Sequence, residues 1–187
     1  DPSKWKDVVA RAPYGICGNG SSHGAFQERF RSDAWPNATV DEVVQELDYR
    51  VGRRHGDVVE PLFCIELKAG PASIDGMSEF QLDVNDFNDI ANGCNGCGLP
   101  AYVFHVQIND EYLPPTRRSV ARNLWWTDVW SLEGALKTVR QRRGEDKRAA
   151  YYKPSAFMAR EGFIEELRIG GYVGLTERLR ANRIPLI

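Results

Sequence analysis

The sequence lacks the features that mark membrane proteins and secreted proteins. Its 187 residues contain no apolar run near the roughly 18 that a transmembrane helix needs, and no signal-peptide pattern opens the chain. The four cysteines are irregularly spaced, unlike those of a secreted disulfide scaffold. We therefore expect one domain in a reducing, intracellular setting, the cytoplasm of a prokaryotic cell.

A general excess of basic residues is absent too, because the formal net charge is −2. This balance argues against a uniformly basic nucleic-acid binder, but the charges are unevenly placed. Residues 116–153 carry ten Lys or Arg against four acids, whereas residues 75–89 carry five acids and no basic residue. Such asymmetry is typical of a surface that faces a polyanion, and equally of a solvated helix end.

What the sequence does contain is a short apolar run, residues 62–70, with the composition and length of a buried strand that Gly70-Pro71 ends. Glu66 and Lys68 lie inside it, two residues apart, so that both point to the same face of the strand. Burying these charges is costly unless each has a partner, and a metal ion or a phosphate would supply one. The alternative is a structural ion pair on the solvent face of an amphipathic strand.

A second acid is expected beside this pair. Residues 40–51 alternate as a strand, residues 52–57 are charged and turn-like, and residues 58–68 return as a second strand. The midpoint between Asp48 and Glu66 falls beside Gly56. A hairpin that turns there brings the two carboxylates opposite each other, within the roughly 5 Å of a cross-strand pair.

The order of the remaining elements predicts an α/β fold, with a mixed central β-sheet flanked by helices. We expect a single domain over residues 1–187, made of a core at about 20–132 and a helical C-terminal appendage at about 133–187. The expected elements are helices at 23–31 and 73–91, strands at 100–108 and 123–132, a basic helix at 132–143, and two helices within 155–187 separated by Gly170-Gly171.

Asp48 on one strand and the Glu66-x-Lys68 pair on the next, within this order of elements, resemble the PD-(D/E)XK nuclease superfamily. The resemblance covers about residues 20–108 and is greatest to archaeal Holliday-junction resolvases and type II restriction enzymes. It implies that Asp48 and Glu66 bind a metal ion and that Lys68 is catalytic. One departure is Leu47, which stands where the family pattern has proline.

Two further positions enter through the same resemblance. The stretch before residue 31 looks like the first helix of the family, which often brings another acid, and Glu28 is the candidate as a catalytic metal ligand. Helical phase nonetheless places His23 and Gln27 nearer the buried side, so the ligand from this helix stays open. Gln81 falls where related nucleases carry a catalytic glutamine after the lysine strand.

The resemblance implies a Mg²⁺-dependent endonuclease, in which Mn²⁺ can substitute, that hydrolyses phosphodiester bonds of DNA in restriction, repair or recombination. Basic side chains of the 116–153 segment would then contact phosphates, and Tyr151 or Tyr152 would stack on bases if single strands bind. We expect the three tryptophans of this segment to pack in the core. The candidate nucleic-acid-binding residues are Arg117, Arg118, Arg122, Arg140, Arg142 and Arg143.

Other readings remain open from sequence. The same fold can serve as a non-cleaving nucleic-acid-binding module, or as a subunit of a homodimer or larger nuclease assembly. Cys94 and Cys97 have the spacing of half a zinc site, which Cys17 or His105 could complete through the fold, although buried or loop thiols are the preferred reading. Cys64 is expected as a packed thiol.

Overall fold

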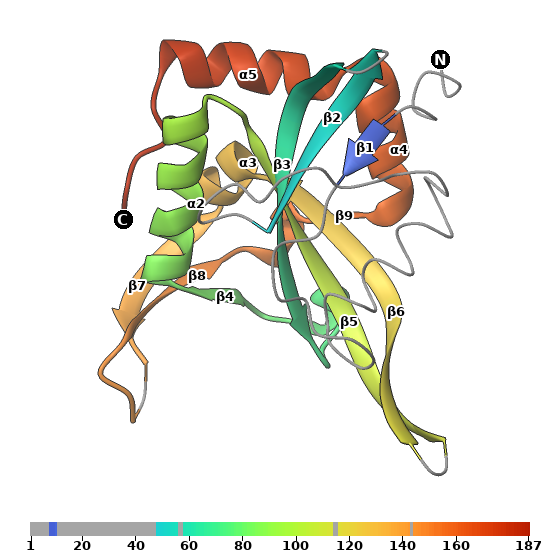
Figure 1. Ribbon diagram of the computed structural model, residues 1–187. Coiled ribbons are helices and arrows are strands. Elements are labelled where there is room, and N and C mark those ends of the chain that lie inside the picture. The colour runs from blue at the N-terminus through green and yellow to red at the C-terminus, as the bar shows by residue number, and fades with distance from the viewer. Residues whose placement is uncertain (1–7, 11–47, 56–57, 114–115, 143) are drawn as a thin grey trace.

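The computed structural model describes residues 8–10, 48–55, 58–113, 116–142 and 144–187. Within this part of the chain, the larger sheet has six strands in the order β1-β2-β3-β5-β6-β9 (Figure 1). Strands β3 and β5 run parallel and their other neighbours run antiparallel, so the sheet is mixed. The strands are β1 (Val8–Ala10), β2 (Tyr49–His55), β3 (Val58–Gly70), β5 (Ala101–Leu113), β6 (Thr116–Asp128) and β9 (Met158–Ala159).

A smaller sheet and the helices cover the larger sheet. Three described strands make the smaller sheet, in the order β4-β8-β7, and all its pairs are antiparallel. Its strands are β4 (Phe80–Asp83), β8 (Arg148–Tyr152) and β7 (Leu136–Gln141). The α-helices are α2 (Val84–Cys97), α3 (Val129–Gly134), α4 (Arg160–Ile169) and α5 (Gly171–Ala181). The predicted α/β class, a mixed central sheet flanked by helices, is confirmed.

Strand β3 separates two hydrophobic layers, because its side chains alternate between the faces of the sheet. Phe63, Ile65 and Leu67 join the layer that contains Phe163 of α4. Cys64 joins the other layer, which is built from α2, α3 and the smaller sheet. Glu66 and Lys68 therefore follow Cys64 toward α2, and this alternation places charges on the face that α2 covers.

The helix predicted at residues 73–91 is wrong in its first half. Residues Ile74–Gly76 form a short 3₁₀ helix, β4 follows, and the α-helix α2 begins only at Val84. In β4 the side chains of Phe80 and Leu82 are buried while Gln81 is exposed, the period of a strand, and β4 pairs with β8. The helix also continues past its predicted end at residue 91 to Cys97, and it is capped by Gly98, whose φ of 72° suits glycine.

The basic helix predicted at residues 132–143 is also wrong. Helix α3 ends at Gly134, and residues 136–141 form β7, an edge strand that pairs with β8. Strands β7, β8 and β9 all come from the segment expected as a helical appendage, so that segment is partly sheet. The two helices separated near Gly170 are present as α4 and α5. None of the described helices is long and apolar enough to span a membrane.

Candidate active site at the end of strand β3

The hairpin of β2 and β3 brings Asp48 beside the Glu66–Lys68 strand. Its register pairs Tyr49 with Ile65, so continuing the ladder by one residue sets Asp48 opposite Glu66, as the spacing predicted. Asp48 Oδ2 accepts a hydrogen bond from the Leu67 backbone N–H at 2.8 Å, which holds its carboxylate against β3. The register of the two strands shifts between Val51 and Gly52. The shift affects the pairs from there to the hairpin turn and leaves the pairs near Asp48 unchanged.

Lys68 joins two carboxylates from different elements. Its Nζ lies 2.9 Å from Glu66 Oε1 and 2.9 Å from Asp86 Oδ2, and Asp86 belongs to the first turn of α2. Glu66 is only 8% exposed, so the pair does not lie on a solvent face as the alternative reading required. The ion pair that this reading predicted is nevertheless present, between the buried Glu66 and Lys68, whose side chain is 26% exposed.

Burial and charge set the protonation of this cluster. Desolvation, followed by the negative charge of Asp48, raises the pKa of Glu66 from 4.5 to about 7, although Lys68 opposes the shift. Burial on its own would lower the pKa of Lys68, but the charge of Glu66 and the hydrogen bonds to Asp86 and Glu66 outweigh it and raise that pKa to about 12. Lys68 is therefore a cation at neutral pH, and Glu66 is poised between its two states.

A cleft of about 540 Å³ opens beside Lys68. Strand β4 supplies Gln81 to its wall, so the glutamine predicted as a site residue and Lys68 face the same space. His105 and Asp86 also reach this space. The lining residues are Lys68, Ala69, Gly70, Pro71, Met77, Glu79, Phe80, Gln81, Leu82, Asp83, Asp86, His105 and Arg142.

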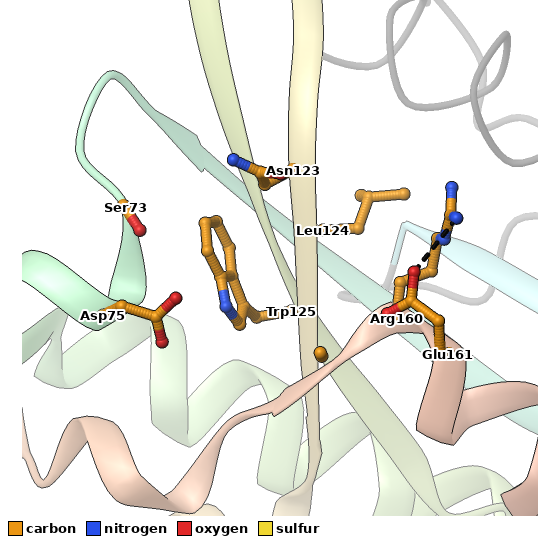
Figure 2. Close-up of a pocket in the computed structure, with 8 residues that line it drawn as sticks. Ser73, Asp75, Asn123, Leu124, Trp125, Arg160 and Glu161 are labelled. Atoms are coloured by element: carbon orange, nitrogen blue, oxygen red, sulfur yellow. Dashed lines mark hydrogen bonds and ion pairs between the residues drawn. The ribbon is translucent and has the colours of Figure 1, made fainter.

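A second hollow, of about 220 Å³, contains none of the predicted site residues. Figure 2 shows Trp125 between Asp75 and the pair formed by Arg160 and Glu161, whose Nη2–Oε1 distance is 3.1 Å. Asn123 completes its polar rim. Of the predicted site residues, Lys68, Gln81 and Arg142 line the larger cleft.

The donor set around Glu66 fits a hard divalent cation. Two carboxylates, from Asp48 and Glu66, are close enough for each charge to act on the other, and Mg²⁺ is commonly held by one or two carboxylates with water and substrate phosphate. Among the described residues, no group of three or more His, Cys, Asp or Glu has the arrangement of a metal site. The predicted first-helix candidates Glu28, Gln27 and His23 lie outside the described residues.

The structure separates the predicted nucleic-acid-binding residues into two groups. Arg117, Arg118 and Arg122 belong to β6, next to its hairpin turn with β5. Arg140, at the end of β7, lies 3.8 Å above the Tyr151 ring and forms an ion pair of 2.6 Å with Glu79. Arg142 lines the cleft, 3.5 Å from Asp83. Arg143 lies outside the described part of the chain.

The aromatic residues behave as core residues. Trp125, Trp126 and Trp130 are buried, as predicted. Tyr152 is buried completely, which contradicts the expectation that it stacks on bases. The reason is that β8 is the central strand of the smaller sheet, with Tyr152 pointing toward Phe87. Tyr151 is half-buried under Arg140.

Two site residues were missed from the sequence. Asp86 was counted in the acidic 75–89 segment, and the structure places it in the first turn of α2. His105 pairs in register with Lys68, is 3% exposed, and contacts the Ala72 carbonyl through Nε2 at 2.9 Å. Burial lowers the pKa of His105, so it is neutral, and its Nδ1 has no partner among the described residues.

Three of the four cysteines fall within the described residues. Cys64 is buried, as predicted for a packed thiol, and Cys94 is buried on α2 whereas Cys97 is exposed. His105, one residue suggested to complete a zinc site, instead uses Nε2 for the Ala72 carbonyl. Cys17, the other, lies outside the described residues. Zinc binding at Cys94 and Cys97 stays a prediction.

Comparisons with known proteins find two solved structures that resemble this chain, both with low sequence identity and low TM-scores. No protein-family model and no curated protein matches the chain. D212, a nuclease from a fusselovirus, is 15% identical, with a TM-score of 0.41 over 91% of this chain and 82% of its own. Hjc, a Holliday junction resolvase from the archaeal hyperthermophile Archaeoglobus fulgidus, is 14% identical, with a TM-score of 0.36 over 67% of this chain and 78% of its own.

Both neighbours are of the kind that the sequence resemblance indicated, a nuclease and a resolvase. Identities of 14–15% and TM-scores below 0.5 are too low for either likeness to assign an activity to this chain. The convergence of Asp48, Glu66 and Lys68 beside a cleft is independent of them, because it follows from the hairpin register and the ion pairs.

Proposed function

We propose that this protein is a Mg²⁺-dependent endonuclease that hydrolyses phosphodiester bonds of DNA. The observation that carries the proposal is the meeting of two carboxylates and one ammonium at the end of β3, beside a cleft of about 540 Å³. A buried acid whose pKa is raised to about 7 costs stability, and such costs concentrate at functional sites.

Asp48 and Glu66 are the residues that would hold the metal ion. Each has one oxygen in an observed contact, Asp48 Oδ2 with the Leu67 N–H and Glu66 Oε1 with Lys68 Nζ, which orients the carboxylate. A bound Mg²⁺ supplies Lewis acidity toward the phosphate and lowers the pKa of a bound water. With a cation present, Glu66 is favoured in its charged form.

Lys68 would act as a fixed positive charge. An ammonium has three N–H donors, and among the described residues Nζ contacts two carboxylates, Glu66 and Asp86, so one donor remains for a phosphate oxygen or the attacking water. A pKa of about 12 makes Lys68 a poor general base at neutral pH. Its role is to orient the water and to stabilise the negative charge that develops on the phosphate.

DNA would enter between two hairpins. Figure 1 shows β5–β6 and β7–β8 projecting from the same end of the molecule, with β4 between them. Arg117, Arg118 and Arg122 belong to the first hairpin, Arg140 belongs to β7 of the second, and Arg142 directly follows β7. Basic residues on both hairpins are suited to phosphates of the two strands of a duplex.

The test is incubation of the purified protein with supercoiled, linear and branched DNA, in Mg²⁺ or in EDTA. We expect nicking or cutting of at least one closed or branched substrate in Mg²⁺ and none in EDTA, with Mn²⁺ able to replace Mg²⁺. Binding without cleavage under all conditions would indicate the alternative, a non-cleaving module or a nuclease subunit. The same digests show whether cutting is internal, because an endonuclease acts on circular DNA that has no ends.

A further inference from the structure

Two asparagines on α2 bind the backbone of the segment that follows α5. Asn88 Nδ2 donates to the Ile187 carbonyl at 3.1 Å, and Asn88 Oδ1 accepts from the Ile187 N–H at 2.9 Å. Asn95 makes the same two bonds with Ile184, at 3.0 Å and 2.9 Å. Each carboxamide therefore satisfies both backbone polar groups of one residue that is distant in the chain.

The spacing of the two asparagines matches the spacing of the residues that they bind. Asn88 and Asn95 are two turns of α2 apart, so they lie on one side of the helix, about 10 Å apart along its axis. An extended chain also rises about 10 Å over three residues, the separation of Ile184 and Ile187. The segment therefore runs antiparallel to α2, and Figure 1 shows it beside this helix.

Apolar packing accompanies these hydrogen bonds. Ile184 is 2% exposed and belongs to the same hydrophobic layer as Phe87 and Ile90 of α2. Ile187 is partly buried and packs against this layer. The segment of residues 182–187, which we call the strap, is thus held on α2 by backbone hydrogen bonds and by buried side chains.

Helix α2 has little tendency to form without such support. It contains four Asn, two Asp and two Gly among its 14 residues, and all three residue types are poor helix formers. Among the described residues, its N-cap Asp83 makes no capping hydrogen bond through its side chain. Contacts with the rest of the molecule must therefore supply most of the stability of α2.

The same helix contributes to the candidate active site. Its first turn carries Asp86, whose Oδ2 lies 2.9 Å from Lys68 Nζ. Asn88 follows Asp86 by two residues, about 200° around the helix, so the strap and Lys68 contact different sides of α2.

We propose that the strap keeps α2 helical and thereby positions Asp86 against Lys68. Asn88 and Asn95 are the positioning residues, because their side chains fix the strap on the helix. The expected effect on cleavage rests on the proposed nuclease function, whereas the effect on α2 itself does not.

The first test is hydrogen–deuterium exchange of α2 peptides from the full chain, with Asn95→Ala compared with Asn92→Ala. Asn92 is exposed on the same helix and is not one of the two asparagines that hold the strap. Alanine is the better helix former at both positions, so helix propensity alone would slow exchange in both variants. We expect α2 amides to exchange about tenfold faster in Asn95→Ala, because two hydrogen bonds to the strap are lost. Exchange in Asn95→Ala that is no faster than in Asn92→Ala would overturn the proposal.

The second test is the cleavage rate at saturating DNA. Asn95 does not line the cleft, yet Asn95→Ala should lower this rate by about 3–10-fold while DNA affinity stays the same. In the Asp86→Asn protein the same substitution should cause little further loss, because the strap acts through Asp86. Equal losses in the two backgrounds would overturn positioning through Asp86. A wild-type protein that cleaves no DNA would refute the proposed function, and exchange would still decide whether the strap supports α2.

Discussion

The two faces of strand β3 differ in what they contribute to the molecule. One face places Phe63, Ile65 and Leu67 in a dry layer with α4 and α5, where burial stabilises the fold. The other face holds Glu66 and Lys68 under α2, where the raised pKa of Glu66 indicates that the folded state disfavours its charge. One strand therefore separates residues that favour folding from residues of the proposed active site.

The apolar face predicts the largest effect. Phe63 is completely buried and lies edge-on to Tyr102, with ring centroids 5.2 Å apart. Phe63→Ala removes its packing and leaves a cavity, so we expect a loss of about 3–5 kcal/mol in the free energy of unfolding. Urea denaturation measures it, and Phe63→Leu, which keeps most of the volume, should lose less. A change below 1 kcal/mol in the alanine variant would contradict the role given to this face.

On the charged face, Lys68→Ala should abolish or nearly abolish cleavage. Loss of a charge positioned for the transition state costs about 10²–10³-fold in rate. DNA affinity, measured by fluorescence anisotropy, should change little, because the basic residues of β6 and β7 remain. Arg168→Ala is the matched control, since this exposed cation pairs with Glu165 on α4, behind the opposite face. Equal loss of affinity and rate for Lys68→Ala would refute a catalytic role.

Glu66→Gln should gain stability while it loses activity. The pKa of Glu66 is 4.5 in the unfolded chain and about 7 in the folded protein, so only the folded state holds this proton between those values. The contribution of Glu66 to the free energy of unfolding is therefore fully present below pH 4.5 and is lost as the pH rises through 7. Without metal, we expect Glu66→Gln to be about 1–3 kcal/mol more stable than wild type at pH 8 and equal to it near pH 4.5.

Denaturation in EDTA at both pH values tests this expectation. Glu79→Gln is the control, because Lys137 and Arg140 lower the pKa of the partly buried Glu79, and its loss should give no gain at pH 8. A Glu66→Gln protein that is less stable than wild type at pH 8 would mean that the ion pair with Lys68 outweighs the cost of burial.

Asp86→Asn should have the smallest effect. It removes one of the two carboxylates that position Lys68, so we expect roughly a tenfold lower cleavage rate and a lower pKa for Lys68. The alkaline limb of the pH–rate profile should therefore move to lower pH, a shift that a purely structural role would not cause. Asp89→Asn, on the exposed side of the same helix, should leave rate and profile unchanged.

The sequence was sufficient for features that local patterns determine. The period-2 alternation in 58–70 and the midpoint of Asp48 and Glu66 beside Gly56 were enough to predict the hairpin and the shared face of Glu66 and Lys68. The break between α4 and α5 at Gly170 could also be predicted from the sequence, because glycine readily adopts the φ of 71° found there.

Features that depend on distant partners could not be predicted in the same way. Strand β4 is a strand because it pairs with β8, which lies 65 or more residues later in the chain. Asp86 reaches Lys68 only because the connection from β3 to the parallel strand β5 passes through α2. Likewise His105 lies beside Lys68 through that parallel pairing, which no local pattern specifies.

The most direct test of the central claim is the rate of plasmid nicking against Mg²⁺ concentration, for wild type and for Asp48→Asn. If Asp48 and Glu66 hold the metal, the wild-type rate saturates with Mg²⁺ and is zero in EDTA. Asp48→Asn should then need about 10–100-fold more Mg²⁺ and nick more slowly, because one charged ligand is gone. Nicking that persists in EDTA, or identical curves for the two proteins, would contradict the account.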